Sequence, residues 1–129
     1  MHAIFANLGS LNSLSPTLVS GKYLQVPTTA RTVIPEACYM LNKKFGPVIE
    51  IKFLEEIISV NLQIEILKFV DILRIAEILK KYKSLNIGFV DGSIVAIAER
   101  LKINQILSLD NKHFSSIIPV GFDYFEILI

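Results

Sequence analysis

The stretch GFVDGSIVAIAERLKI at residues 88–103, followed by QILSLD at 105–110, decides the fold of this chain. Asp91 is expected at the start of a helix, because a short acidic side chain accepts hydrogen bonds from the free N–H groups there and favours the N-cap. The apolar face of this helix is expected to consist of Ile94, Val95, Ala98 and Leu101. The apolar run that follows predicts a strand ending at Asp110. A helix therefore leads into a strand, with an acid at the beginning of one and at the end of the other.

The same alternation continues upstream and downstream of this stretch. Residues 23–28 and 62–66 read as short strands, and 124–128 as a final strand. Helices are expected from Pro35 to about Gly46, from Pro47 onward, and over 69–83. Strands that alternate with helices of this length predict crossover units and a mainly parallel sheet. The expected class is a layered α/β fold.

Two of these helices carry apolar stripes that should face the core. Ile51, Leu54 and Ile58 recur at helical spacing in the helix that Pro47 begins. In the next helix the stripe is Ile72, Ile75, Ala76 and Leu79. The acids Asp71, Glu55, Glu56 and Glu77 lie among lysines, and we expect them on solvated helix faces.

The 129 residues fit a single domain over 1–129, whose first 21 residues are weakly patterned. A net charge of +1 gives no general basic excess for nucleic-acid binding, so any such contact must be local. Basic residues that could supply it are Lys43, Lys44, Arg100 and Lys112. Ordinary surface lysines and arginine are the alternative interpretation.

A reducing, cytoplasmic location is expected from the cysteine content and from the N-terminal sequence. Cys38 is the one cysteine, so no internal disulfide can form, and with His2 and His113 it gives no zinc cluster. It is expected to be a small buried residue on a helix. His113 is expected in a turn. The first 21 residues lack both the basic start and the unbroken apolar run of a secretory signal, and no segment is apolar enough to span a membrane.

Three acids fall where chemistry gathers in a parallel sheet, at strand ends and at the starts of the following helices. They are Glu36, Asp91 and Asp110. Crowded carboxylates repel one another, and a hard cation such as Mg²⁺ or Mn²⁺ resolves that repulsion and can activate water. Each acid also has a purely structural alternative: Asp91 as a cap, Glu36 as a charge at a helix start, and Asp110 as a turn residue.

Over about residues 23–128 the chain resembles the PIN-domain family. The resemblance is carried by the block quoted above, which ends in Ser108-Leu109-Asp110 and is followed by Phe114, and by VIPEACYML at residues 33–41. The resemblance implies a three-layer α/β/α fold with a mainly parallel sheet. It also implies a pocket in which Glu36, Asp91 and Asp110 bind Mg²⁺ or Mn²⁺ and catalyse the hydrolysis of RNA. Many bacterial members are toxins held by a cognate antitoxin, and many form homodimers.

The chain departs from the family pattern in its first unit. The family's first strand ends in an Asp, whereas this sequence has no Asp or Glu before Glu36. Asn7 is the nearest counterpart, and an amide binds a divalent cation more weakly than a carboxylate. The first unit has either decayed or begins upstream of the given start. Two further functions stay open: a non-catalytic relative that binds a partner, and, more weakly, a nucleotide or phospho-receiver module.

Overall fold

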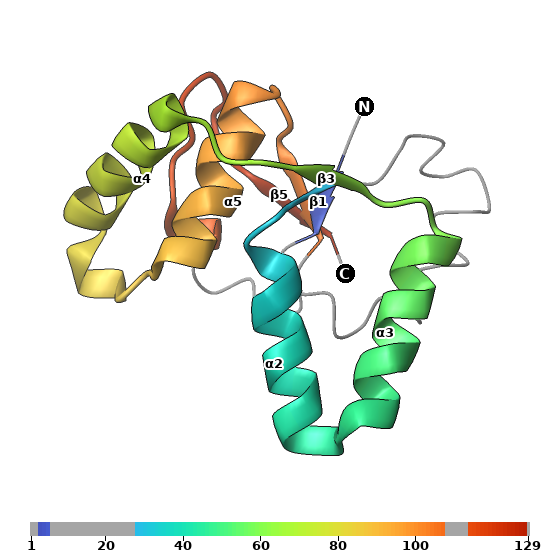
Figure 1. Cartoon of the computed structure of the whole chain (residues 1–129). Coiled ribbons are helices and arrows are strands. Elements are labelled where there is room, and N and C mark those ends of the chain that lie inside the picture. Colours follow the sequence, from blue (N-terminus) through green and yellow to red (C-terminus); the bar gives the residue numbers. More distant parts are fainter. Residues whose placement is uncertain (1–2, 6–27, 108–113, 129) are drawn as a thin grey trace.

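The computed structural model describes residues 3–5, 28–107 and 114–128. Within these ranges the strands are β1 (Ala3–Phe5), β2 (Thr28–Ala30), β3 (Gln63–Glu65), β4 (Gln105–Leu107) and β5 (Glu126–Leu128). They form one sheet in the order β3-β2-β1-β4-β5, and every neighbouring pair is parallel. The predicted α/β class with a mainly parallel sheet is confirmed (Figure 1).

The parallel arrangement brings all the strand ends that matter for function to one rim. The chain leaves β2 at Ala30 and enters α2 (Val33–Phe45) almost at once. Helix α5 (Phe89–Arg100) precedes β4 and runs back along the sheet, so its first turn lies at the same rim as the carboxyl ends of the strands. The starts of α2 and α5, which are far apart in the sequence, thus lie at the same rim of the sheet.

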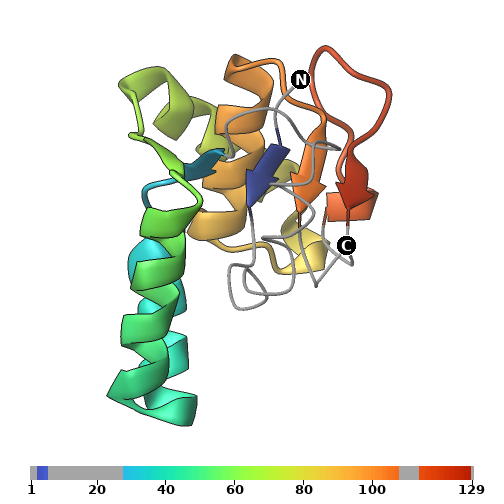
Figure 2. The same cartoon turned by 90° about the vertical axis from the view of Figure 1, so that its right-hand side faces the viewer.

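Helices α2 and α3 (Pro47–Ser59) form a hairpin that projects away from the sheet (Figure 1, Figure 2). Gly46 joins them with φ of 90°, a value that favours glycine, and Pro47 begins α3 as predicted. Pro35 lies inside the first turn of α2, because the helix begins two residues earlier than expected.

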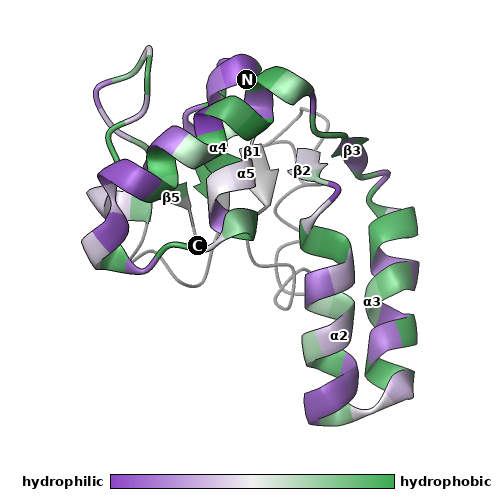
Figure 3. Ribbon diagram, turned by 60° about the vertical axis from the view of Figure 1, so that its left-hand side comes forward, coloured by the Kyte–Doolittle hydropathy of each residue, from purple (hydrophilic) through white to green (hydrophobic). Residues whose placement is uncertain are grey.

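The predicted apolar stripe of α3 is wrong. Phe53 and Ile57 are the buried residues of this helix, whereas Ile51 is 54% and Ile58 77% exposed, and Leu54 is also exposed. Green apolar segments therefore remain on the surface of the hairpin in Figure 3. The spacing was helical, but the hairpin offers the core only one narrow face, so periodicity alone could not identify which apolar row is buried.

Helix α4 (Phe69–Lys81) packs against α5, and α5 in turn contacts β2. Covered from both sides, α5 is buried continuously from Gly92 to Ala98. A side chain at Gly92 would place its Cβ 3.0 Å from Cγ2 of Ile75, so the glycine permits this close approach of the two helices. Of the predicted α4 stripe, Ile75 is buried, but Ile72 and Ala76 are exposed.

Charged side chains also hold α4 to α5. Asp71, only 2% exposed, accepts hydrogen bonds from Nε of Arg100 at 2.9 Å and from Nη2 at 3.0 Å. Arg74 donates to both carboxylate oxygens of Glu99, at 2.7 and 2.9 Å. The expectation that Asp71 lies on a solvated face is wrong, because an arginine on the neighbouring helix pairs with it.

Two short 3₁₀ turns, η2 (Lys83–Leu85) and η3 (Phe114–Ser116), complete the described elements. Among the residues that the structure describes, no helix combines the length and the apolar character needed to cross a membrane.

Candidate functional site

Glu36 lies in the first turn of α2, at the rim where β2 ends. The helix starts here because VIPEACYML offers a proline within the first turn and then an unbroken set of helix-compatible residues. Its side chain is exposed, so it can meet a ligand from solution.

Asp91 lies in the first turn of α5 and is half-buried. The prediction that it caps the helix is wrong: Gly88 occupies the N-cap, and α5 begins at Phe89. As the third helical residue, Asp91 still stands at the positive end of the helix dipole, which favours its carboxylate. Its side chain does not serve as the N-cap of this helix.

Glu36 and Asp91 lie close enough for the charge of one to act on the other. Partial loss of hydration and then the negative charge of Asp91 raise the pKa of the Glu36 carboxyl group. A raised pKa means that the ionised form of Glu36 is disfavoured where it stands. The two acids thus form a mutually repelling pair at one rim of the sheet.

Asn7 and Asp110, the other predicted site residues, lie outside the described residues. The strands that precede them in the chain are described. Phe5 and Leu107 are paired in adjacent strands, and the chain leaves both strands at the rim that carries Glu36 and Asp91.

A pair of hydroxyl groups beside these acids was not anticipated from the sequence. Oγ1 of Thr32 lies 2.6 Å from Oγ of Ser93 and joins the start of α2 to the start of α5. Oγ of Ser93 also donates to the carbonyl oxygen of Val90 at 2.6 Å. The signal available in the sequence was a serine directly before the apolar residues of this helix. A serine that becomes buried there needs a hydrogen-bond partner.

The two acids suit a hard divalent cation by their chemistry. Carboxylate oxygens are the ligands that Mg²⁺ and Mn²⁺ prefer, and Mg²⁺ is commonly held by one or two carboxylates together with water. A cation would also offset the repulsion between Glu36 and Asp91, which adds to the effect of burial in raising the pKa of Glu36. Within residues 3–5, 28–107 and 114–128, however, no cluster of three or more acidic, histidine or cysteine side chains could hold a metal. A third protein ligand must come from elsewhere, and Asp110 is the predicted one.

The basic residues near this rim differ from those expected. Arg100 is at the far end of α5, paired with Asp71 and 3.7 Å from a carboxylate oxygen of Glu65, so it is engaged within the fold. Arg31, which follows β2 directly at the acidic rim, is exposed. Lys112 and His113 lie outside the described residues. Arg31 is therefore the basic side chain that sequence reasoning overlooked.

Cys38 is half-buried on α2, close to the expectation of a small core residue. Burial and then the charge of Glu50 raise the pKa of its thiol. Since the thiolate is the reactive form, this position does not favour nucleophilic chemistry.

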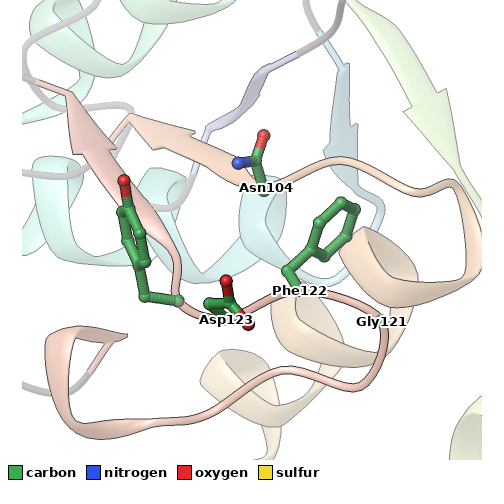
Figure 4. A pocket seen from close by; sticks show the side chains of 5 residues that line it. Asn104, Gly121, Phe122 and Asp123 are labelled. Carbon is green, nitrogen blue, oxygen red and sulfur yellow. The ribbon is translucent and has the colours of Figure 1, made fainter.

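A surface hollow of about 550 Å³ lies away from the acids. Its lining consists of Asn104, Gly121, Phe122, Asp123 and Tyr124, which precede β4 and β5 (Figure 4). The amino ends of parallel strands lie at the rim opposite to their carboxyl ends, so this hollow is not part of the Glu36–Asp91 site.

Known proteins resemble this chain in sequence and in fold. No family model matches it. Ribonuclease VapC26 of Mycobacterium tuberculosis is 29% identical over 96 residues, which cover 74% of this chain and 71% of that protein. VapC20 of the same organism, a toxin that cleaves the sarcin–ricin loop, superposes with a TM-score of 0.67 at 15% identity, covering 87% of this chain and 92% of VapC20.

A toxin–antitoxin complex from Klebsiella pneumoniae superposes with a TM-score of 0.63 at 16% identity, over 95% of this chain and 98% of that one. These structural likenesses confirm the three-layer α/β/α fold that was predicted. The chain is thus similar in sequence to a VapC ribonuclease and in fold to VapC20, in agreement with its resemblance to the PIN-domain family.

Proposed function

We propose that this chain is a metal-dependent endoribonuclease of the PIN type that acts as the toxin of a toxin–antitoxin pair. VapC ribonucleases are metal-dependent as a family. The observation that carries the proposal is the Glu36–Asp91 pair at the carboxyl rim of the sheet, in a chain similar to a ribonuclease. Without a cation, the repulsion between two carboxylates at this rim destabilises the folded chain. With a cation bound, the same carboxylates would hold a metal that can activate water.

In the proposed site Glu36, Asp91 and Asp110 hold Mg²⁺ or Mn²⁺, and Asn7 contributes an amide oxygen. The cation would supply a water-derived nucleophile and stabilise the charge that builds on the scissile phosphate. Asp91 orients its oxygens from the rigid, buried helix α5, while Glu36 approaches from the exposed start of α2. In this proposal residues 1–129 form a single domain, and all four groups belong to it.

The proposed substrate is structured or single-stranded RNA. VapC20 cleaves the sarcin–ricin loop, which makes that hairpin a rational first substrate. Arg31, exposed at the same rim, is placed to contact a backbone phosphate, and Lys43 and Lys44 are exposed further along α2. Phosphate contacts of this kind position RNA without reading its sequence.

The proposed partners are a cognate antitoxin and a second copy of this chain, acting in the cytoplasm. The Klebsiella pneumoniae neighbour is a toxin–antitoxin complex, which supports the first. Exposed apolar residues on α3, among them Ile58 at 77% and Ile51 at 54% exposure, support a protein–protein interface on the hairpin. We assign this face to the homodimer.

A catalytically impaired PIN-like domain that retains only partner binding is the second candidate. The observation in its favour is Asn7, which stands where the family pattern has an acid. Metal-dependent cleavage of RNA, compared between the natural chain and variants at Asn7 and Asp91, separates the two functions.

A further inference from the structure

The direction of the two hydroxyl bonds between α2 and α5 can be deduced. A serine hydroxyl has one proton, and that of Ser93 is donated to the carbonyl oxygen of Val90. In the 2.6 Å contact with Thr32, Ser93 can then only accept, so Thr32 donates. The result is a directed chain from Thr32 to Ser93 to the backbone of Val90, the residue before Asp91.

The side chain of Thr32 makes this bond and does not cap its own helix. It occupies the N-cap of α2, where threonine commonly caps with its side-chain oxygen, yet no side-chain capping bond is formed. The hydroxyl bonds instead to a residue of another helix, and Ser93 is fully buried there. A buried polar link between elements fixes their separation more narrowly than apolar packing does.

We infer that Thr32 and Ser93 are a positioning pair that sets the separation of Glu36 and Asp91 for cation binding. Glu36 lies one helical turn beyond Thr32, and Asp91 lies two residues before Ser93. The link therefore joins the two helix starts beside the two carboxylates. This inference rests on the proposed metal-dependent function and adds residues that do not themselves touch the metal.

Removing the link should weaken cation binding without removing a ligand. Thr32→Val keeps the branched shape and deletes the hydroxyl, and Ser93→Ala deletes its acceptor. Groups that orient metal ligands typically change metal affinity by tenfold or more, so each variant should bind Mn²⁺ about tenfold more weakly. Thr32→Ser, which retains the hydroxyl, should bind Mn²⁺ nearly as well as the natural residue. The double variant should lose little more than either single one, because both remove the same bond.

The experiment measures the Mn²⁺ dissociation constant of the full chain by calorimetric titration, together with RNA affinity in EDTA and melting temperature. Ser59→Ala is the matched control, since Ser59 donates to the Glu56 carbonyl at 2.9 Å on α3 but joins no second helix. It should leave Mn²⁺ affinity unchanged. RNA affinity in EDTA should be the same for all variants, which separates ligand positioning from general damage to the fold.

The possible results of this experiment separate the positioning role from the proposed metal site. Mn²⁺ binding to the natural chain that Thr32→Val and Ser93→Ala leave unchanged overturns the positioning role and leaves the proposed function intact. A Thr32→Ser variant as weak as Thr32→Val also overturns it, because the hydroxyl is then not the cause. No Mn²⁺ binding to the natural chain overturns the proposed metal site itself, and this inference with it.

Discussion

Glu36 on α2 and Asp91 on α5 lie at one rim of the sheet, where partial burial and then the negative charge of Asp91 raise the pKa of the Glu36 carboxyl group. The strand order explains why these two residues are neighbours. Helix α2 follows β2, helix α5 precedes β4, and β1 lies between β2 and β4 in the parallel sheet. Because the two acids repel at the same rim, a divalent cation should bind there and stabilise the folded chain.

The first prediction is thermal stabilisation by metal. Mn²⁺ or Mg²⁺ at a hundred times its dissociation constant should add about 2.7 kcal/mol to the free energy of unfolding, because it binds the folded site and not the unfolded chain. Glu36→Gln and Asp91→Asn should each reduce the rise in melting temperature. Glu77→Gln, at a 68% exposed side chain on α4, is the control and should leave the rise intact. An equal rise in all the variants would place the cation elsewhere.

The second prediction concerns Arg31 at the acidic rim. Arg31→Ala should weaken RNA binding in EDTA at every sequence tested and reduce the slope of log affinity against log salt by about one, as expected when one phosphate contact is lost. Lys102→Ala, at an exposed residue just beyond the end of α5 that is opposite to Asp91, should change neither quantity. Filter binding over a range of salt concentrations measures both. RNA binding that is identical for Arg31→Ala and the natural chain would remove Arg31 from the proposed interface.

The third prediction concerns the Asp71–Arg100 pair. Burial alone would raise the pKa of Asp71, but the Arg100 hydrogen bonds, the Lys68 backbone N–H and the two positive charges together lower it below 3.8. Asp71 therefore stabilises the fold above the unfolded pKa, and this contribution is lost as the pH falls through the lower folded pKa. At pH 7, Asp71→Asn should lower the free energy of unfolding by about 3 kcal/mol.

Urea denaturation as a function of pH measures this effect. The difference between Asp71→Asn and the natural chain should stay constant from pH 7 to pH 5 and narrow in stronger acid. A difference that instead grows on acidification would contradict the assigned direction of the pKa shift.

The sequence predicted the class of fold because its helix starts and strand alternation are local features. Pro47 at the start of α3 and the alternating residues around β3 were found from composition and spacing alone. The buried faces of α3 and α4 were not. Ile58 and Ile72 have the right spacing but face solvent, since which apolar row is buried depends on how each helix is placed in three dimensions.

Of the candidate site, the sequence predicted that Glu36 and Asp91 lie at one rim, but it did not predict the hydroxyl pair and Arg31 beside them. Glu36 and Asp91 were found because acids at the starts of helices that flank a parallel sheet fall where chemistry gathers in such folds. The Thr32–Ser93 bond joins residues from separate helices, so no local pattern reveals it. Arg100 was considered for RNA contact, but its carboxylate partners, Asp71 and Glu65, come from other elements that only the fold brings near.

The fourth prediction concerns the exposed apolar face of α3. If this face forms the homodimer, sedimentation should give twice the chain mass for the natural protein and a single chain mass for the Ile51→Glu, Ile58→Glu double variant. Lys52→Glu, exposed between these positions, controls for the added negative charge. A natural chain that sediments as a monomer at high concentration would exclude the dimer, and a double variant that still dimerises would place the interface on another face.

Position 7 gives the fifth prediction. Replacing Asn7 by Asp adds a charge where the family pattern has an acid, which should tighten the metal and help orient the attacking water. RNA cleavage by Asn7→Asp should therefore exceed that of the natural chain at equal metal concentration. Asn12→Asp, a similar change nearby in the sequence, should not raise it. Equal rates for Asn7→Asp and the natural chain would exclude position 7 from the site.

The most direct measurement is metal-dependent cleavage of a sarcin–ricin loop hairpin and of mixed structured RNAs by the purified chain. Four proteins are compared: the natural chain, Asn7→Asp, Asp91→Asn, and Asn7→Asp combined with Asp91→Asn. We expect weak cleavage by the natural chain and faster cleavage by Asn7→Asp, both abolished by EDTA and by Asp91→Asn. Cleavage that survives Asp91→Asn or EDTA, or no cleavage by either the natural chain or Asn7→Asp, would contradict this expectation.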